Sequence, residues 1–174
     1  FINCVLKSCL WVRAENADEA ARNGFLTERF QRVRSTRLSS NRAATKALAE
    51  APYAFGEVRQ KGSEPAIVIP RITSERRPYL PVGLIEEGAI VSSQNFALYD
   101  AELWVLACLV SRLHRTWIAT VCGRTRTDFA YSNTLGWNTF PMPRLTEQNK
   151  GDLTRCAENI LLAREAHFPA TIAD

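Results

Sequence analysis

Residues 121–143 read VCGRTRTDFAYSNTLGWNTFPMP and form the stretch around which the rest of this chain is organised. The stretch follows the longest apolar helical pattern and closes with two prolines. Within it, Arg124, Arg126 and Asp128 occupy alternate positions of a short segment typical of β structure. Alternate side chains of an extended segment point to the same side. The pattern therefore predicts that these three charges are presented together, where water or a ligand can reach them.

A long amphipathic helix is predicted immediately before this stretch, from residue 101 to about residue 121. Its apolar stripe consists of Leu103, Leu106, Ala107, Leu109, Val110, Leu113, His114 and Trp117. A stripe this wide predicts burial along most of the helix. We interpret His114 as a core or boundary histidine with satisfied hydrogen bonds, and not as a ligand.

Short strands are predicted upstream of that helix. Residues 65–72 have the composition of a strand. Pro70 indicates either that this strand lies at a sheet edge or that it ends at the proline, because proline has no backbone N–H to donate to a β-ladder. Residues 82–99 contain two or three further strand-like runs separated by turn signals, the pattern of a β-meander. Residues 1–12 also have the composition of a strand or hairpin.

Positive charge is distributed unevenly along the chain and is concentrated in the N-terminal third. Within residues 22–46, Glu28 is the single acid, and the bases are Arg22, Arg29, Arg32, Arg34, Arg37, Arg42 and Lys46. They lie on a predicted helix that Gly24 divides and on a weaker one at residues 45–54. Two interpretations stay open for this basic face. It is a solvated surface, or it contacts a phosphate backbone.

A second basic cluster occupies the loop that contains TSERRPYLP, residues 73–81. In this proline-bounded loop Ser74 and Tyr79 are surrounded by three arginines, Arg71, Arg76 and Arg77. Prolines stiffen such a loop and lower the entropy that it loses on gripping a ligand. A stiff loop with arginine and serine side chains suits phosphate oxygens. The alternative is a surface loop whose arginines pair with Glu64 and Glu75.

Composition argues against several classes of protein. The apolar content of 46% and the charged content of 23% are ordinary for one globular domain. The five cysteines lack CxxC spacing and the two histidines are too few for a zinc site, so we expect core thiols in a cytoplasmic protein. No apolar run approaches the length of a membrane span. Glycine-rich phosphate loops, HExxH and GxSxG are all missing from the sequence.

The fold class expected from these patterns is α/β of the mixed α+β kind. We predict a small, twisted, mostly antiparallel sheet packed by the long buried helix. A last amphipathic helix begins after Thr146, and it either connects to another domain or docks on the same core. Because the chain begins with Phe1 and not with Met, we expect it to be a segment of a longer protein. Arginine-rich faces and loops on such a fold favour a nucleic-acid reader.

Four strings identify a family that this chain resembles. They are CLWV at residues 9–12, PRITSERRPYLPVG at 70–83, SRLHRTWIATVCGRTRTDFAYSNT at 111–134 and WNTFPMP at 137–143. In this order they are similar to the target-recognition region of single-chain type II (IIG/IIL-like) restriction–modification enzymes, which carry a fused adenine-specific DNA methyltransferase. The resemblance implies a DNA target-recognition domain at residues 1–143 and a helical connector or spacer at residues 144–174.

The resemblance also implies which parts of such an enzyme lie elsewhere. The methyltransferase of this family binds S-adenosylmethionine and flips an adenine, with a cofactor motif and an (N/D)PP(Y/F) tetrad that this sequence does not contain. We therefore expect no catalytic residue, metal or cofactor in this chain. The expected partners are double-stranded DNA and the catalytic methyltransferase domain of the same polypeptide, with no membrane. The alternatives are a protein–protein docking module or, with less support, a small enzyme.

By position in this family, Arg126 and Asp128 read one base pair. Arginine can donate twice to the Hoogsteen edge of guanine and aspartate can accept from the amine of cytosine, so together they suit a G·C pair. The alternative is a salt bridge between Arg126 and Asp128 across one strand face. The residues expected to contact the DNA backbone are Arg71, Ser74, Arg76, Arg77, Arg124, Tyr131 and Ser132.

Overall fold

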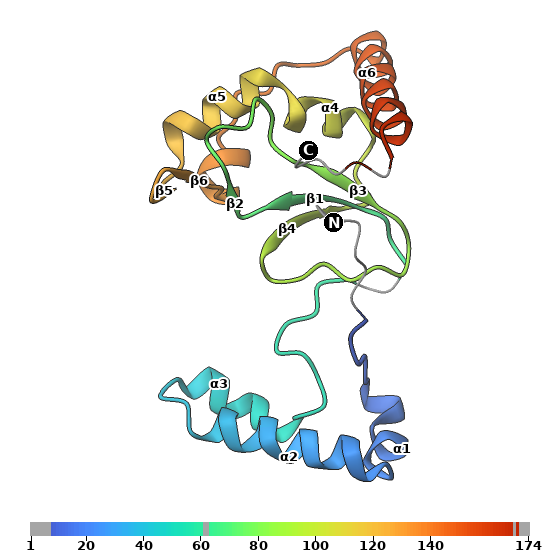
Figure 1. Cartoon of the computed structure of the whole chain (residues 1–174), viewed down its shortest axis with the longest axis vertical. Coiled ribbons are helices and arrows are strands. Elements are labelled where there is room, and N and C mark those ends of the chain that lie inside the picture. The colour runs from blue at the N-terminus through green and yellow to red at the C-terminus, as the bar shows by residue number, and fades with distance from the viewer. Residues whose placement is uncertain (1–7, 61–62, 169, 171–174) are drawn as a thin grey trace. The chain divides into compact units, whose positions relative to one another are not determined.

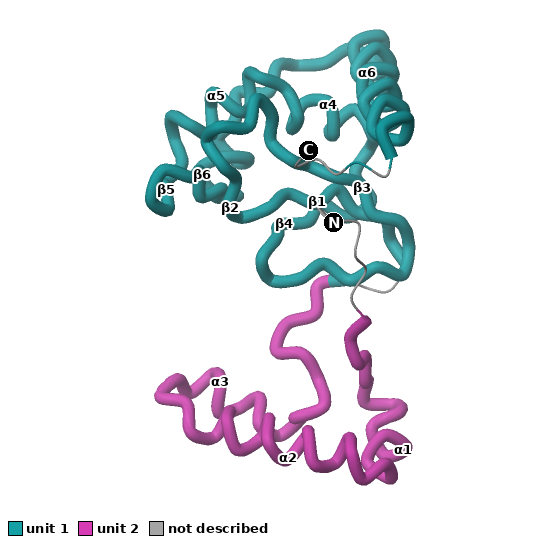
Figure 2. Tube along the Cα trace, viewed as in Figure 1, with its two compact units in different colours: residues 1–5, 60–174 teal, residues 6–59 magenta. Residues whose placement is uncertain are grey.

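The computed structural model describes residues 8–60, 63–168 and 170, and these residues form two compact units (Figure 2). Unit 2 comprises the described residues before Gln60, and unit 1 contains Gln60 and the described residues that follow it. The strand or hairpin predicted for residues 1–12 falls mostly outside the described residues. Its described part, residues 8–12, forms no regular structure.

Unit 2 is built from helices alone in its described part. In chain order they are η1 Ala14–Asn16, α1 Ala17–Ala21, α2 Gly24–Leu38, α3 Ala43–Ala47 and η2 Leu48–Glu50. The expected division at Gly24 is confirmed, because the side chain of Asn23 accepts hydrogen bonds from the amides of Phe25 and Leu26 and starts α2 as a new helix.

One arginine of the basic face has a structural role in unit 2. The guanidinium of Arg37 donates to the carbonyls of Leu48, Ala51 and Ala54 at 2.7, 2.9 and 2.8 Å, which ties α2 to the segment that contains η2. Within the described part of the chain, the other bases of residues 22–46 form no ion pair. Both interpretations of that face, solvated or phosphate-binding, therefore stay open.

The first sheet of unit 1 has the strand order β3-β1-β4, and both of its pairings are antiparallel (Figure 1). Its strands are β1 Ala66–Pro70, β3 Gly83–Ile85 and β4 Asn95–Tyr99. The five residues of β1 are buried, which suits its central place. Pro70 lies at the end of β1, one of the two expected positions. The meander prediction is wrong, because β1 separates β3 from β4 and residues 89–93 form no strand.

A second antiparallel sheet has the order β2-β6-β5. Its strands are β2 Ile72–Thr73, β5 Arg124–Thr125 and β6 Asp128–Ala130. The chain passes from the first sheet to the second at Arg71, whose carbonyl accepts a hydrogen bond of 2.8 Å from the amide of Tyr131. The mixed α+β class and its antiparallel pairing are confirmed, with two small sheets in place of the single sheet expected.

The long helix predicted before the focal stretch is two helices, α4 Trp104–Val110 and α5 Arg112–Val121. Ser111 separates them with an extended ψ of 150°, and its hydroxyl accepts from the amide of His114, which starts α5. One extended residue changes the helical phase. Leu113, which fits the predicted stripe, is therefore 68% exposed, whereas His114 and Ile118 are fully buried.

The last helix, α6 Glu147–Ala166, docks on the core of unit 1 beside α4 (Figure 1). Ala157 is fully buried in that core, and the guanidinium of Arg164 donates to the carbonyl of Val82 at 2.7 Å. The structure therefore has the docked arrangement, and a further role of this helix as a connector stays a prediction. Among the described residues, none of the helices is both long and apolar enough to cross a membrane.

Candidate functional site

The two predicted reading residues lie at a hairpin turn. β5 and β6 pair antiparallel with Thr125 opposite Asp128, so Arg126 and Thr127 form a two-residue turn. The expectation that Arg124, Arg126 and Asp128 alternate along one extended segment is therefore wrong. The chain reverses direction between Thr125 and Asp128, which puts Arg126 at the tip and Asp128 at the start of the returning strand.

The backbone of Arg126 is in a conformation that favours glycine. Its φ is 60°, in the left-handed region, which costs a residue with a side chain about 1–2 kcal/mol. Such residues cluster at functional sites, where the surrounding structure holds them in place. Among the ion pairs of the described residues, none involves Arg126 or Asp128, so the alternative of a salt bridge between them is not observed.

This strain gives a stability prediction. Arg126→Gly should raise the free energy of unfolding of unit 1 by about 0.5–1 kcal/mol, because relief of the left-handed φ outweighs the greater backbone entropy of glycine in the unfolded chain. Denaturant unfolding measures the change. Thr127→Gly is the matched control, since Thr127 is not among the residues with positive φ, and it should lower the same quantity. Equal destabilisation by both changes would contradict a strained turn.

Arg124 contacts the protein in three places. Its Nη1 donates to Oε2 of Glu75 at 2.9 Å and to the carbonyl of Thr127 at 2.8 Å. Its guanidinium also lies 4.8 Å from the centroid of the Phe129 ring. The loop that contains Glu75 is thereby joined to the hairpin. Of the arginines predicted to contact phosphate, Arg124 is the one that pairs with Glu75.

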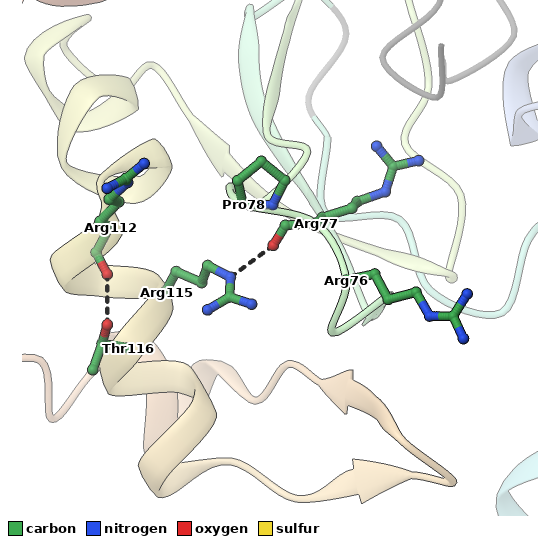
Figure 3. A pocket seen from close by; sticks show the side chains of 6 residues that line it. All are labelled: Arg76, Arg77, Pro78, Arg112, Arg115 and Thr116. Atoms are coloured by element: carbon green, nitrogen blue, oxygen red, sulfur yellow. Dashed lines mark hydrogen bonds between the residues drawn. The ribbon is translucent and has the colours of Figure 1, made fainter.

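Arg115 on α5 holds the same loop from another side, a role that the sequence did not reveal. Its Nε donates to the carbonyl of Arg77 at 2.8 Å and its Nη2 to the carbonyl of Glu75 at 2.6 Å, as the view in Figure 3 shows for Arg77. Its guanidinium lies 5.2 Å from the centroid of Phe129. These contacts span 38 and 40 residues of sequence, so no local pattern could have indicated them.

The loop and α5 together form an open pocket of about 260 Å³ (Figure 3). Its lining consists of Arg76, Arg77, Pro78, Arg112, Arg115 and Thr116. Four of these six residues are arginines and none is acidic, so the surface around the pocket is positive. Figure 3 shows the side chain of Arg76 extending away from α5. Arg112, which we did not predict as a site residue, adds a further exposed charge.

The other predicted backbone contacts differ in how accessible they are. Arg71 is exposed, with its guanidinium 5.0 Å from the centroid of the Phe96 ring. The hydroxyl of Ser74 accepts from the amide of Arg76 at 3.3 Å, and that of Ser132 accepts from the amide of Leu135 at the start of the π-helical turn η3, Asn133–Trp137. Both serines are partly exposed and shape local turns.

The structure corrects the expectation that Tyr131 contacts the DNA backbone. Its side chain is only 6% exposed and its hydroxyl lies 3.2 Å from Nε2 of His114, so it belongs to the core and does not reach a phosphate. Burial raises the pKa of Tyr131 well above its ordinary value. The core position of His114 is confirmed, but the expectation of satisfied hydrogen bonds is wrong for one ring nitrogen, because Nδ1 is buried with no hydrogen-bond partner among the described residues. This histidine is fully buried, its ring is 4.6 Å from that of Phe140, and burial lowers its pKa to about 4.

Residues 1–144 match the family model of the MmeI target recognition domain. The chain belongs to this family. The resemblance that its sequence strings indicated is therefore confirmed.

Among the described residues, no group of histidine, cysteine, aspartate and glutamate side chains could hold a metal ion.

Two relatives of this member of the MmeI target-recognition family align with nearly all of this chain. DNA methyltransferase A of Bacillus subtilis (strain 168) is 36% identical over 165 residues, which are 95% of this chain and 19% of that protein. The solved structure of the type IIL restriction–modification enzyme MmeI in complex with DNA is 28% identical with a TM-score of 0.90, and the match covers 95% of this chain and 22% of that one. The chain thus spans about a fifth of each relative.

Within this MmeI-family domain, tertiary structure brings together two segments that are about 50 residues apart. The hairpin supplies the predicted base readers, and the loop before β3 supplies the predicted phosphate contacts Arg76 and Arg77. The contacts of Arg115 and Arg124 join them. The individual roles of these residues toward DNA stay predictions.

Proposed function

We propose that this chain recognises a specific sequence in double-stranded DNA, as the target-recognition domain of an adenine-specific DNA methyltransferase or restriction–modification protein. The observation that carries the proposal is membership of the MmeI target-recognition family over residues 1–144. The arrangement of an exposed hairpin tip beside an arginine-rich loop supports it, because DNA readers combine residues that face bases with residues that face phosphates.

The hairpin is the element proposed to read bases. The major groove of B-DNA admits a two-stranded β-ribbon, and β5 and β6 form such a ribbon with Arg126 at its tip. The Arg126 guanidinium would donate two hydrogen bonds to O6 and N7 of a guanine. The Asp128 carboxylate would accept from the exocyclic amine of the paired cytosine.

The loop is the element proposed to fix the register of the domain on the duplex. Arg71, Arg76 and Arg77 would contact phosphate oxygens, which hold a protein in place without reading sequence. Ser74 and Ser132 are further candidates, since each hydroxyl accepts a backbone hydrogen bond through its oxygen and can still donate its proton to a phosphate oxygen. The exposed Arg112, beside the loop arginines in the pocket lining, extends the positive surface.

Catalysis is assigned to another part of the same polypeptide. We propose that a methyltransferase domain binds S-adenosylmethionine and modifies adenine in the bacterial cytoplasm, while this domain selects the site. The tetrad and the cofactor motif are missing from these 174 residues, so no residue here is assigned to cofactor binding or methyl transfer. The likeness to a DNA methyltransferase of B. subtilis supports this division of labour.

Selection from a pool of randomised DNA duplexes tests the proposal with the full-length protein that carries this chain. We expect one sequence motif to be enriched. If the protein enriches no motif, the proposal is wrong. If it also binds random duplexes no better at low salt than at high salt, nonspecific binding to DNA is excluded as well. A docking domain for an acidic protein partner is then favoured.

The loop predicts a change in salt dependence. Arg76→Ala should weaken binding to all duplexes alike and reduce the slope of log K against log salt by about 0.9, the value for one lost phosphate contact. Binding of the enriched motif and of a scrambled duplex at several salt concentrations measures both effects. Arg155→Ala on α6 is the matched control, because this arginine pairs with Asp152 away from the loop. Loss of preference for the motif without a change in slope would contradict a phosphate contact.

A further inference from the structure

The turn that carries Arg126 is held at its backbone by a chain of two contacts. The carbonyl of Thr127, the second residue of the turn, accepts a hydrogen bond of 2.8 Å from Nη1 of Arg124. The same nitrogen donates to the carboxylate of Glu75 at 2.9 Å. Glu75 therefore contacts the turn through Arg124, which lies 49 residues away from it in sequence.

The other end of this chain is anchored as well. The backbone carbonyl of Glu75 accepts a hydrogen bond of 2.6 Å from Arg115, which belongs to α5. The Phe129 ring, 3% exposed on β6, has the guanidinium groups of Arg115 and Arg124 within 5.2 and 4.8 Å of its centroid. Since α5 packs in the core through Ile118, the Glu75 carboxylate extends from a backbone that is fixed to a rigid element.

The turn needs a constraint from outside the hairpin. β5 has two residues, both exposed, and such a short ribbon is only marginally stable by itself. Arg126 adds a left-handed φ that a side chain disfavours. Without support, the tip would sample several conformations, and a two-pronged contact to a guanine edge depends on one of them.

Electrostatics points the same way. Glu75 is an exposed acid between Ser74 and Arg76, in the loop proposed to contact DNA phosphates. A carboxylate there repels phosphates and lowers affinity for every sequence. A favourable effect of the Glu75 side chain on recognition would therefore come from its pair with Arg124.

We propose that Glu75 is a positioning residue for base reading, which sets specificity by holding Arg124 on the Thr127 carbonyl and so fixing the Arg126 turn. This inference rests on the proposed function of sequence-specific DNA recognition. It also reassigns Arg124, which we expected to contact a phosphate, to a brace within the protein. Glu75 touches no base in this arrangement and acts only through its neighbours.

The test is Glu75→Gln in the full-length protein, which removes the charge and keeps the size of the side chain. Discrimination at the base pair read by the turn should fall about two- to fivefold, as expected for the loss of one partly exposed ion pair. Affinity for random duplex DNA should rise at low salt, because a repulsive charge is gone. Specificity and overall affinity therefore move in opposite directions, which simple damage to the fold would not produce.

Arg124→Gln and the double variant complete the cycle. If Glu75 acts through Arg124, adding Glu75→Gln to Arg124→Gln causes no further loss of discrimination. A phosphate contact by Arg124 would instead lower affinity for all duplexes without changing discrimination, and would overturn the inference. Glu86→Gln is the matched control, since Glu86 is exposed and outside the network, and it should leave discrimination unchanged.

The two proposals fail in different ways. If the unmodified protein enriches no sequence, the proposed function is wrong. If the unmodified protein enriches a sequence and Glu75→Gln shows the same discrimination at the base pair read by the turn, the positioning role alone is wrong.

Discussion

Arg126→Ala is expected to relax discrimination at one base pair of the recognition sequence and to leave the preference at the other positions intact. A bidentate contact between arginine and guanine contributes about 1–3 kcal/mol of discrimination, so the preference for G·C at that position should fall by a factor of roughly 5 to 150. Relative binding of duplexes that carry each single substitution of the enriched motif measures the change, in the full-length protein.

Asp128→Ala supplies the matched variant for this prediction. Asp128 starts the returning strand opposite Thr125 and is proposed to read the other base of the same pair. Its loss should relax the same position and no other. Arg76→Ala should instead weaken all duplexes alike. If Arg126→Ala and Arg76→Ala cause the same loss on every duplex, the assignment of reading to the hairpin and of phosphate contact to the loop is wrong.

Arg126→Gly separates reading from stability. Glycine relieves the left-handed φ and also removes the guanidinium, so this variant should be more stable than the parent and no more specific than Arg126→Ala. A general loss of structure cannot then explain the loss of specificity. A stable Arg126→Gly protein that still prefers G·C at this position would contradict the proposed contact.

Because of His114, the free energy of unfolding of unit 1 is expected to decrease as the pH falls from about 6.5 to about 4. Its folded pKa of about 4 lies below the ordinary value of 6.5, because burial disfavours the charged ring. Between these values the unfolded chain binds a proton that the folded chain does not. The stabilisation that the neutral His114 ring gives to the folded state is therefore complete above pH 6.5 and is lost progressively below it. Below pH 4 it changes little further, and the total loss is about 3 kcal/mol.

Denaturant unfolding at several pH values between 4 and 7 checks this expectation. His114→Gln should remove most of the pH dependence in that window, whatever it does to stability at neutral pH. His167→Gln is the control for the removal of a histidine outside the core, because His167 is exposed at the end of α6. An unaltered profile in His114→Gln would assign the pH dependence to other groups.

The hairpin shows why part of the site could not be predicted from sequence. Two-residue hairpin turns usually contain glycine, asparagine or aspartate at positions with positive φ. The central residues here are Arg126 and Thr127, so the segment has no local turn signal and reads as one strand. The contacts that reach this hairpin from outside the segment are the pair between Glu75 and Arg124 and the guanidinium of Arg115 over the Phe129 ring, and no local pattern indicates either.

The break at Ser111 shows the same limit for helices. The apolar stripe on either side of it is continuous in sequence, and a serine inside such a stripe is compatible with one long helix. Folding instead uses the hydroxyl of Ser111 to start α5, which buries His114 and exposes Leu113. Two short helices pack where one straight helix was expected, and the register of the second could be read only from the structure.

The sequence by itself determined the family, through four strings that resemble its target-recognition region. It also determined the mixed α+β class, the strand that ends at Pro70 and the buried place of His114, through local composition and periodicity, which act through the burial of apolar side chains. Only the tertiary structure decided that Tyr131 is a core residue, that Arg126 sits at a turn with a left-handed φ, and that Glu75, Arg115 and Arg124 join the loop to the hairpin. Those facts depend on contacts between residues tens of positions apart, and such contacts form only when the sheets and α5 have packed together.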